Sequence, residues 1–123
     1  MKRVLRVLWI VAILVVVVAS LLSSDSASMQ LLATLPIGDK FEHLTAYVAL
    51  AFLPAIHERR GFIIAAALGA IALGIALEYA QRYTGWRDYE TGDMIADVIG
   101  VCIGAGLGLS MRPLANRLLF SAD

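Results

Sequence analysis

The chain has 123 residues, of which 60% are hydrophobic and 16% are charged, and its formal net charge is zero. This length allows one domain, while the apolar content is too high for a soluble globular protein and indicates a membrane protein. A neutral chain offers no basic surface to nucleic acid, and the single cysteine, Cys102, excludes an internal disulfide.

Four apolar segments predict an all-α polytopic membrane protein, in which four transmembrane helices form a compact bundle as a single domain over residues 1–123. About 20 helical residues cross a hydrocarbon core of about 30 Å. We therefore expect helices at about residues 4–22, 39–57, 61–81 and 92–111. A second interpretation of the first segment is a cleavable signal peptide, because small residues follow its basic start and apolar run.

Basic residues predict the orientation, because cytoplasmic loops are enriched in Lys and Arg. Seven of the ten basic residues lie at the start of the first helix, between the second and third, or after the fourth: Lys2, Arg3, Arg6, Arg59, Arg60, Arg112 and Arg117. We therefore expect both termini in the cytoplasm. On this side we expect His57 to be solvated and residues 112–123 to form a short amphipathic helix on the inner leaflet.

Polar side chains interrupt the last three apolar segments near the outer end of the predicted bundle. His43, Glu78 and Asp97 lie at similar depths, about one turn inside the outer boundary. A central Asp costs about 2.5–3.5 kcal/mol on insertion scales, so such residues usually mark a functional site. The residues expected to form this site are Asp39, Lys40, His43, Tyr47, Glu78, Gln81, Arg82, Arg87, Asp93 and Asp97.

Structural roles are an alternative for some of these residues. Asp39 and Glu42 form a capping-box-like pattern, and Glu78 and Arg82 have the i, i+4 spacing of a helical ion pair. Asp97 has no such role, because it lies in an apolar stretch where a carboxylate needs a partner or a proton.

The cations of the expected site predict the class of ligand. Lys40, Arg82 and Arg87 surround the outer mouth, and two helix amino ends point the same way and favour anions. The outer leaflet offers phosphate head groups and lipid-linked cell-wall precursors. We therefore expect a membrane lipid or such a precursor as the partner.

The order of the motifs resembles a known family. The motifs are Asp39-Lys40-x-x-His43-x-x-x-Tyr47, then Glu78-x-x-Gln81, then Arg87, Asp93, Ala96 and Gly100. Over about residues 39–108 this pattern resembles the VanZ-like family of small membrane proteins, and it departs from that family at Asp97, where the family usually has Asn. The resemblance implies a bacterial inner-membrane protein and a tie to glycopeptide (teicoplanin) tolerance, but it supplies no reaction.

Several functions remain open at this point. The first is binding of the lipid ligand without turnover. The second is a membrane-embedded hydrolase or transferase, in which His43 acts as general acid or base, tuned by Asp39 or Glu78, and water attacks. A metal version would use His43, Glu78, Asp93 and Asp97, although one histidine is few for zinc, and we expect neither a metal nor a cofactor. Transport or proton relay is the third, but the inner halves of the segments show no polar path. A purely structural role is the fourth.

Glycines on the last segment predict close helix packing. Gly100, Gly104 and Gly108 form two overlapping GxxxG pairs. They serve either to pack helices within the bundle or to form a homodimer.

Overall fold

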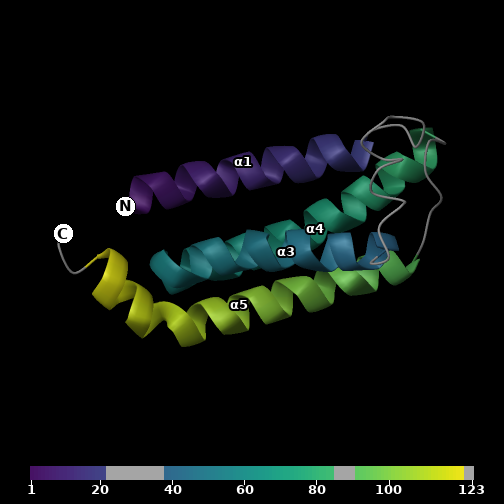
Figure 1. Cartoon of the computed structure of the whole chain (residues 1–123). Coiled ribbons are helices and arrows are strands. Elements are labelled where there is room, and N and C mark those ends of the chain that lie inside the picture. The colour runs from purple at the N-terminus through teal and green to yellow at the C-terminus, as the bar shows by residue number, and fades with distance from the viewer. Residues whose placement is uncertain (22–37, 85–90, 121–123) are drawn as a thin grey trace.

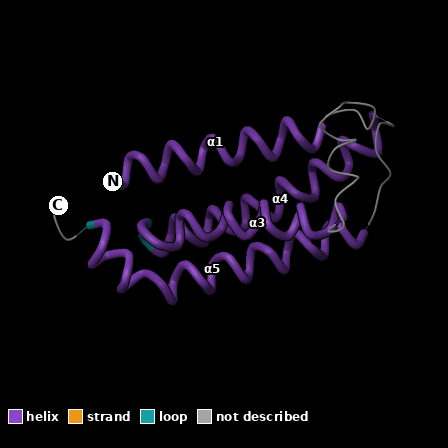
Figure 2. Tube along the Cα trace, viewed as in Figure 1, coloured by secondary structure: helices purple, strands orange, loops and turns teal. Residues whose placement is uncertain are grey.

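The structure is a computed structural model that describes residues 1–21, 38–84 and 91–120, without the side chains of residues 38–43, 81, 82, 84 and 91–93. Over these ranges the elements are four helices, α1 (Lys2–Leu21), α3 (Gly38–His57), α4 (Arg60–Thr84) and α5 (Thr91–Leu119). They lie lengthwise beside one another, with α1 and α4 running in one direction and α3 and α5 in the other (Figure 1; Figure 2).

The last helix differs from our expectation. We predicted an end near residue 111 and a separate short helix, but α5 continues to Leu119 with Pro113 inside it. The final turns of α5 bend towards the start of α1 (Figure 1). Leu119 and Phe120 pack there against a small core of Leu5, Ile56 and Ala115, so the C-terminal segment closes one end of the bundle.

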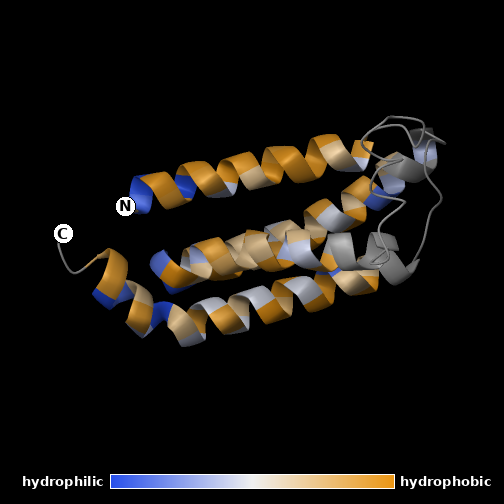
Figure 3. Cartoon of the chain, viewed as in Figure 1, coloured by the Kyte–Doolittle hydropathy of each residue, from blue (hydrophilic) through white to orange (hydrophobic). Residues whose placement is uncertain are grey.

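Three of the helices are long and apolar enough to cross a membrane: Lys2–Leu21, Arg60–Ala80 and Met94–Leu119. The apolar part of α3 is shorter, Leu44–His57. Helix α1 is hydrophobic almost throughout (Figure 3), and many of its large side chains are exposed, including Val7, Leu14 and Val18. Soluble monomers rarely expose such extensive apolar surface, so these helices indicate a multi-pass membrane protein.

Helix α3 lies against α5 because glycines on α5 leave room for its backbone. A Cβ atom on Gly100 would lie 2.7 Å from the backbone oxygen of Leu44, and one on Gly108 would lie 2.5 Å from the Cβ atom of Ala55. A Cβ atom on Gly104 would collide with the backbone of Val48. The glycine face therefore packs within the chain, and a homodimer through the same face stays a prediction.

A proline explains how α1 is fixed to α3. Pro54 has no backbone N–H, so the carbonyl of Leu50, four residues earlier, loses its usual helical donor. The indole Nε1 of Trp9 donates to this carbonyl at 2.8 Å. The rings of Trp9 and Phe62 on α4 also pack in an inclined, edge-type contact, with 5.5 Å between ring centroids. One side chain of α1 thus contacts both neighbouring helices.

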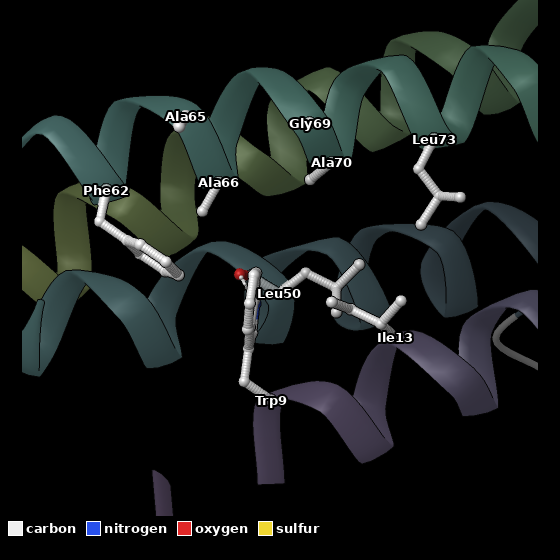
Figure 4. A pocket seen from close by; sticks show the side chains of 9 residues that line it. All are labelled: Trp9, Ile13, Leu50, Phe62, Ala65, Ala66, Gly69, Ala70 and Leu73. Atoms are coloured by element: carbon white, nitrogen blue, oxygen red, sulfur yellow. Dashed lines mark hydrogen bonds between the residues drawn. The ribbon is translucent and has the colours of Figure 1, made fainter. Parts of the chain in front are cut away.

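An apolar groove of about 380 Å³ lies beside this contact, between α1 and α4 with Leu50 of α3 at its base (Figure 4). Its lining residues are Trp9, Ile13, Leu50, Phe62, Ala65, Ala66, Gly69, Ala70 and Leu73. None of these side chains carries an ionisable group, so the groove has no acid–base chemistry, and the candidate site lies elsewhere.

Candidate functional site

Three polar side chains from three helices are buried together in the half of the bundle that contains Gly38, Thr84 and Thr91, which we call the acidic end. Tyr47 of α3, Glu78 of α4 and Asp97 of α5 have exposed fractions of 2%, 1% and 2%. Tyr47 is within electrostatic range of both carboxylates. Each of the three takes part in a polar or electrostatic interaction. We call this group the carboxylate cluster.

The carboxylates of the cluster lie at matched depths. Glu78 is six residues before the last residue of α4 and Asp97 is six residues after the first residue of α5. At 1.5 Å per residue, each lies roughly 9 Å from its helix end. Burying a carboxyl group at this depth in an apolar bundle costs free energy. Contact with water therefore does not explain why two of them lie there together.

A glycine on α4 makes room for Asp97. A Cβ atom on Gly74 would lie 2.6 Å from Oδ2 of Asp97, which is closer than real Cβ atoms approach a neighbour. On the other side, a Cβ atom on Gly100 would lie 3.1 Å from the Cβ atom of Tyr47. Two glycines therefore let three helices meet around the cluster, and they position its side chains through backbone packing.

The other residues of the expected site are only partly described. Asp39, Lys40 and His43 lie in the first turns of α3, Gln81 and Arg82 near the end of α4, and Asp93 in the first turn of α5, while Arg87 lies outside the described residues. The helices bring these backbone positions to the acidic end. Their side chains lie outside the description, so their part in the site stays a prediction.

A second buried group lies at the opposite end, which we call the basic end, and our sequence analysis did not foresee it. We expected His57 to be solvated, but this is wrong, since its exposed fraction is 6%. Its Nδ1 lies 2.6 Å from the carbonyl oxygen of Leu53, an acceptor only, so Nδ1 carries hydrogen and donates. Its Nε2 lies 3.1 Å from Oε1 of Glu58. These two contacts fix the ring against the helix end.

Glu58 joins α1 to the turn between α3 and α4. The guanidinium of Arg6 donates from Nε to Oε1 at 2.5 Å and from Nη2 to Oε2 at 3.1 Å. This two-pronged hydrogen bond holds the pKa of the Glu58 carboxyl below its usual value, and nearby His57 lowers it further while burial opposes both. The signal in the sequence is an acid among basic residues at a predicted helix end.

Arg112 of α5 completes the basic end. Its Nη1 donates to the carbonyl oxygens of Ala55 at 3.1 Å and Glu58 at 2.6 Å. These are carbonyls at the C-terminal end of α3, where helical donors run out, so an arginine there satisfies and stabilises the helix end. The group at the basic end is thus a structural network.

Metal binding finds no support in the described part of the chain. Among its side chains, no group of three or more His, Cys, Asp or Glu residues comes together to hold an ion. Two members of the metal set considered from the sequence, His43 and Asp93, have side chains outside the description.

Comparison with known proteins yields no assignment: no family model, no curated protein and no solved structure matches this chain.

Proposed function

We propose that this chain is a VanZ-like protein of the bacterial inner membrane that crosses the bilayer four times, with both termini in the cytoplasm. Three helices of spanning length support a multi-pass protein. The fourth, α3, has 20 residues and lies along α4 and α5 (Figure 1), and 20 residues reach about 30 Å. The basic residues at one end favour placing that end in the cytoplasm.

We propose further that the acidic end forms an outer-face site for a phosphate-bearing lipid or lipid-linked cell-wall precursor. The observation that carries this proposal is the burial of Tyr47, Glu78 and Asp97 from three helices at the acidic end. Carboxylate oxygens accept hydrogen bonds, so they suit hydroxyl or amino groups of a head group. The phosphate would engage Lys40 and Arg87, two of the cations that the sequence predicts for this site. A tie to teicoplanin tolerance would follow from engaging such precursors.

Native mass spectrometry of the detergent-purified protein tests this proposal. We expect a phosphate-bearing lipid to co-purify with the natural chain and to be lost from a variant that carries His43→Ala and Glu78→Gln. Glu58→Gln is the matched control, since it makes the same carboxylate-to-amide change at the other end. Retention of the same lipid by the double variant, at equal abundance, would contradict an outer site.

The second candidate is a membrane-embedded hydrolase or transferase acting on the same class of lipid. Its support is Glu78, whose almost complete burial is typical of a carboxylate placed for acid–base chemistry. His43, on the preceding turn from Tyr47, would be its partner, with water as nucleophile. Incubation with a polyprenyl diphosphate, followed by phosphate release, separates the two functions. Release that Glu78→Gln abolishes would favour the enzyme, and binding without release would favour the binding protein.

A further inference from the structure

A cleft of about 550 Å³ opens between α4 and α5 at the basic end. Two arginines and three aliphatic side chains line it: Arg60, Ile63, Ile64, Leu109 and Arg112. Ile64 and Leu109 are exposed, with 61% and 47% of their surfaces accessible. The lining therefore combines a cationic part with an apolar part in which Ile64 and Leu109 are exposed.

Arg112 is held in a fixed position beside this cleft. Both hydrogens of Nη1 are used by the carbonyls of Ala55 and Glu58. A guanidinium has five N–H donors, so Nε and Nη2 together keep three that engage no acceptor within the described chain. Because the side chain is already ordered, a ligand that accepts from these donors incurs little further entropic cost.

No carboxylate in the described part of the chain is available to neutralise the cleft. Among the described side chains of the basic end are seven Lys and Arg residues and one carboxylate, Glu58, so positive charge predominates there. Glu58 already accepts from Arg6 through both oxygens. Arg60 begins α4, where the helix dipole disfavours a cation and favours an anion.

We propose that this cleft binds an anionic phospholipid of the adjacent leaflet, with its phosphate between Arg60 and Arg112 and one acyl chain over the exposed Ile64 and Leu109. Guanidinium groups bind phosphate through paired hydrogen bonds, and basic clefts between membrane helices suit anionic head groups. The aliphatic residues extend from the arginines along α4 and α5, as an acyl chain extends from its head group. This site is separate from the one at the acidic end and stands without it.

The test compares phosphatidylglycerol with phosphatidylcholine of the same acyl chains, titrated into delipidated protein and followed by native mass spectrometry. We expect the natural chain to prefer phosphatidylglycerol. Arg60→Gln should weaken phosphatidylglycerol binding by about fivefold to tenfold, the loss expected for one basic residue near an anionic head group. Arg59→Gln is the matched control, because Arg59 is the adjacent arginine and does not line the cleft. It should change binding by less than about twofold.

Two further measurements separate the contribution of the phosphate to binding from that of the acyl chain. Leu109→Asn should weaken phosphatidylglycerol binding, and excess inorganic phosphate should not displace the lipid. Displacement by inorganic phosphate would identify a free-anion site and overturn the lipid assignment. Equal binding of the two lipids, or equal losses in Arg60→Gln and Arg59→Gln, would overturn the proposal altogether. Arg60→Lys, which keeps the charge, should retain most of the binding and so shows that loss in Arg60→Gln is not misfolding.

Discussion

Glu58 at the basic end and Glu78 in the carboxylate cluster are both buried, but different parts of the chain position them. Glu58 is held by the guanidinium of Arg6, and His57 lies beside it. Glu78 lies near Tyr47 and Asp97, in a cluster where glycines let the neighbouring helices pack closely. An ion pair fixes the first end, whereas backbone packing brings two carboxyl groups together at the second. Such a collection has little structural benefit, which is why we propose a function for the acidic end.

The largest expected effect comes from breaking what both ends share, the contact of α3 with α5. In Gly104→Ala the new methyl group would collide with the backbone of Val48, so the helices must separate. Overpacking typically costs about 1–3 kcal/mol, and a backbone collision belongs at or above the upper limit. Gly106→Ala is the matched control, because nothing lies within 4 Å of its Cβ position. Thermal unfolding in detergent should show a much lower midpoint for Gly104→Ala alone, and equal midpoints would contradict the packing.

The same chemical change at the two ends should give opposite results. Glu58→Gln removes the carboxylate that pairs with Arg6 and lies against buried His57, and an unsatisfied buried group costs about 1–3 kcal/mol. Its melting midpoint should fall while lipid retention at the acidic end is preserved. Glu78→Gln should lose that retention with a smaller change in midpoint. If both variants lose stability alike and neither loses lipid, the contrast between the ends is wrong.

A pair of glycines on α4 tests how the cluster is positioned. Gly74→Ala would press on Oδ2 of Asp97, and because a side-chain tip can shift, we expect a cost of about 1 kcal/mol. Gly69→Ala meets nothing within 4 Å, so it should stabilise α4 by about 0.5–1 kcal/mol, the usual gain in a helix interior. Lipid retention should decrease only in Gly74→Ala. A stabilised Gly74→Ala with normal retention would show that Asp97 is not placed by this glycine.

The four helices could be predicted from the sequence because apolar length is a local property. Close packing of α5 was also foreseeable, since Gly100, Gly104 and Gly108 mark a face, but the sequence did not identify α3 as the helix that packs there. The bond from Trp9 to the carbonyl of Leu50 was not, because its partners are 41 positions apart. The carbonyl of Leu50 accepts this bond because Pro54 lacks the backbone N–H that would otherwise donate to it. That Trp9 is the donor is known only once α1 is placed beside α3.

The error at His57 has the same origin. A histidine followed by Glu58 and two arginines has the composition of a solvated loop, and the partner of Glu58, Arg6, is 52 positions away. The burial of Glu78 and Asp97 could be predicted, because a carboxylate in an apolar run is conspicuous. The role of Gly74 could not, because it depends on which residue of another helix faces it.

The smallest expected effect is the pH dependence of the pair at the basic end. The pKa of Glu58 is lower in the folded chain than its ordinary value of 4.5, chiefly because Arg6 donates to it. A depressed carboxyl pKa contributes stability that is fully present above about pH 4.5 and is lost as the pH falls through the lower folded value. The difference in melting midpoint between the natural chain and Glu58→Gln should therefore be constant near neutral pH and shrink below about pH 4.5. A difference that grew on acidification would mean that the pairing of Arg6 with Glu58 does not stabilise the basic end.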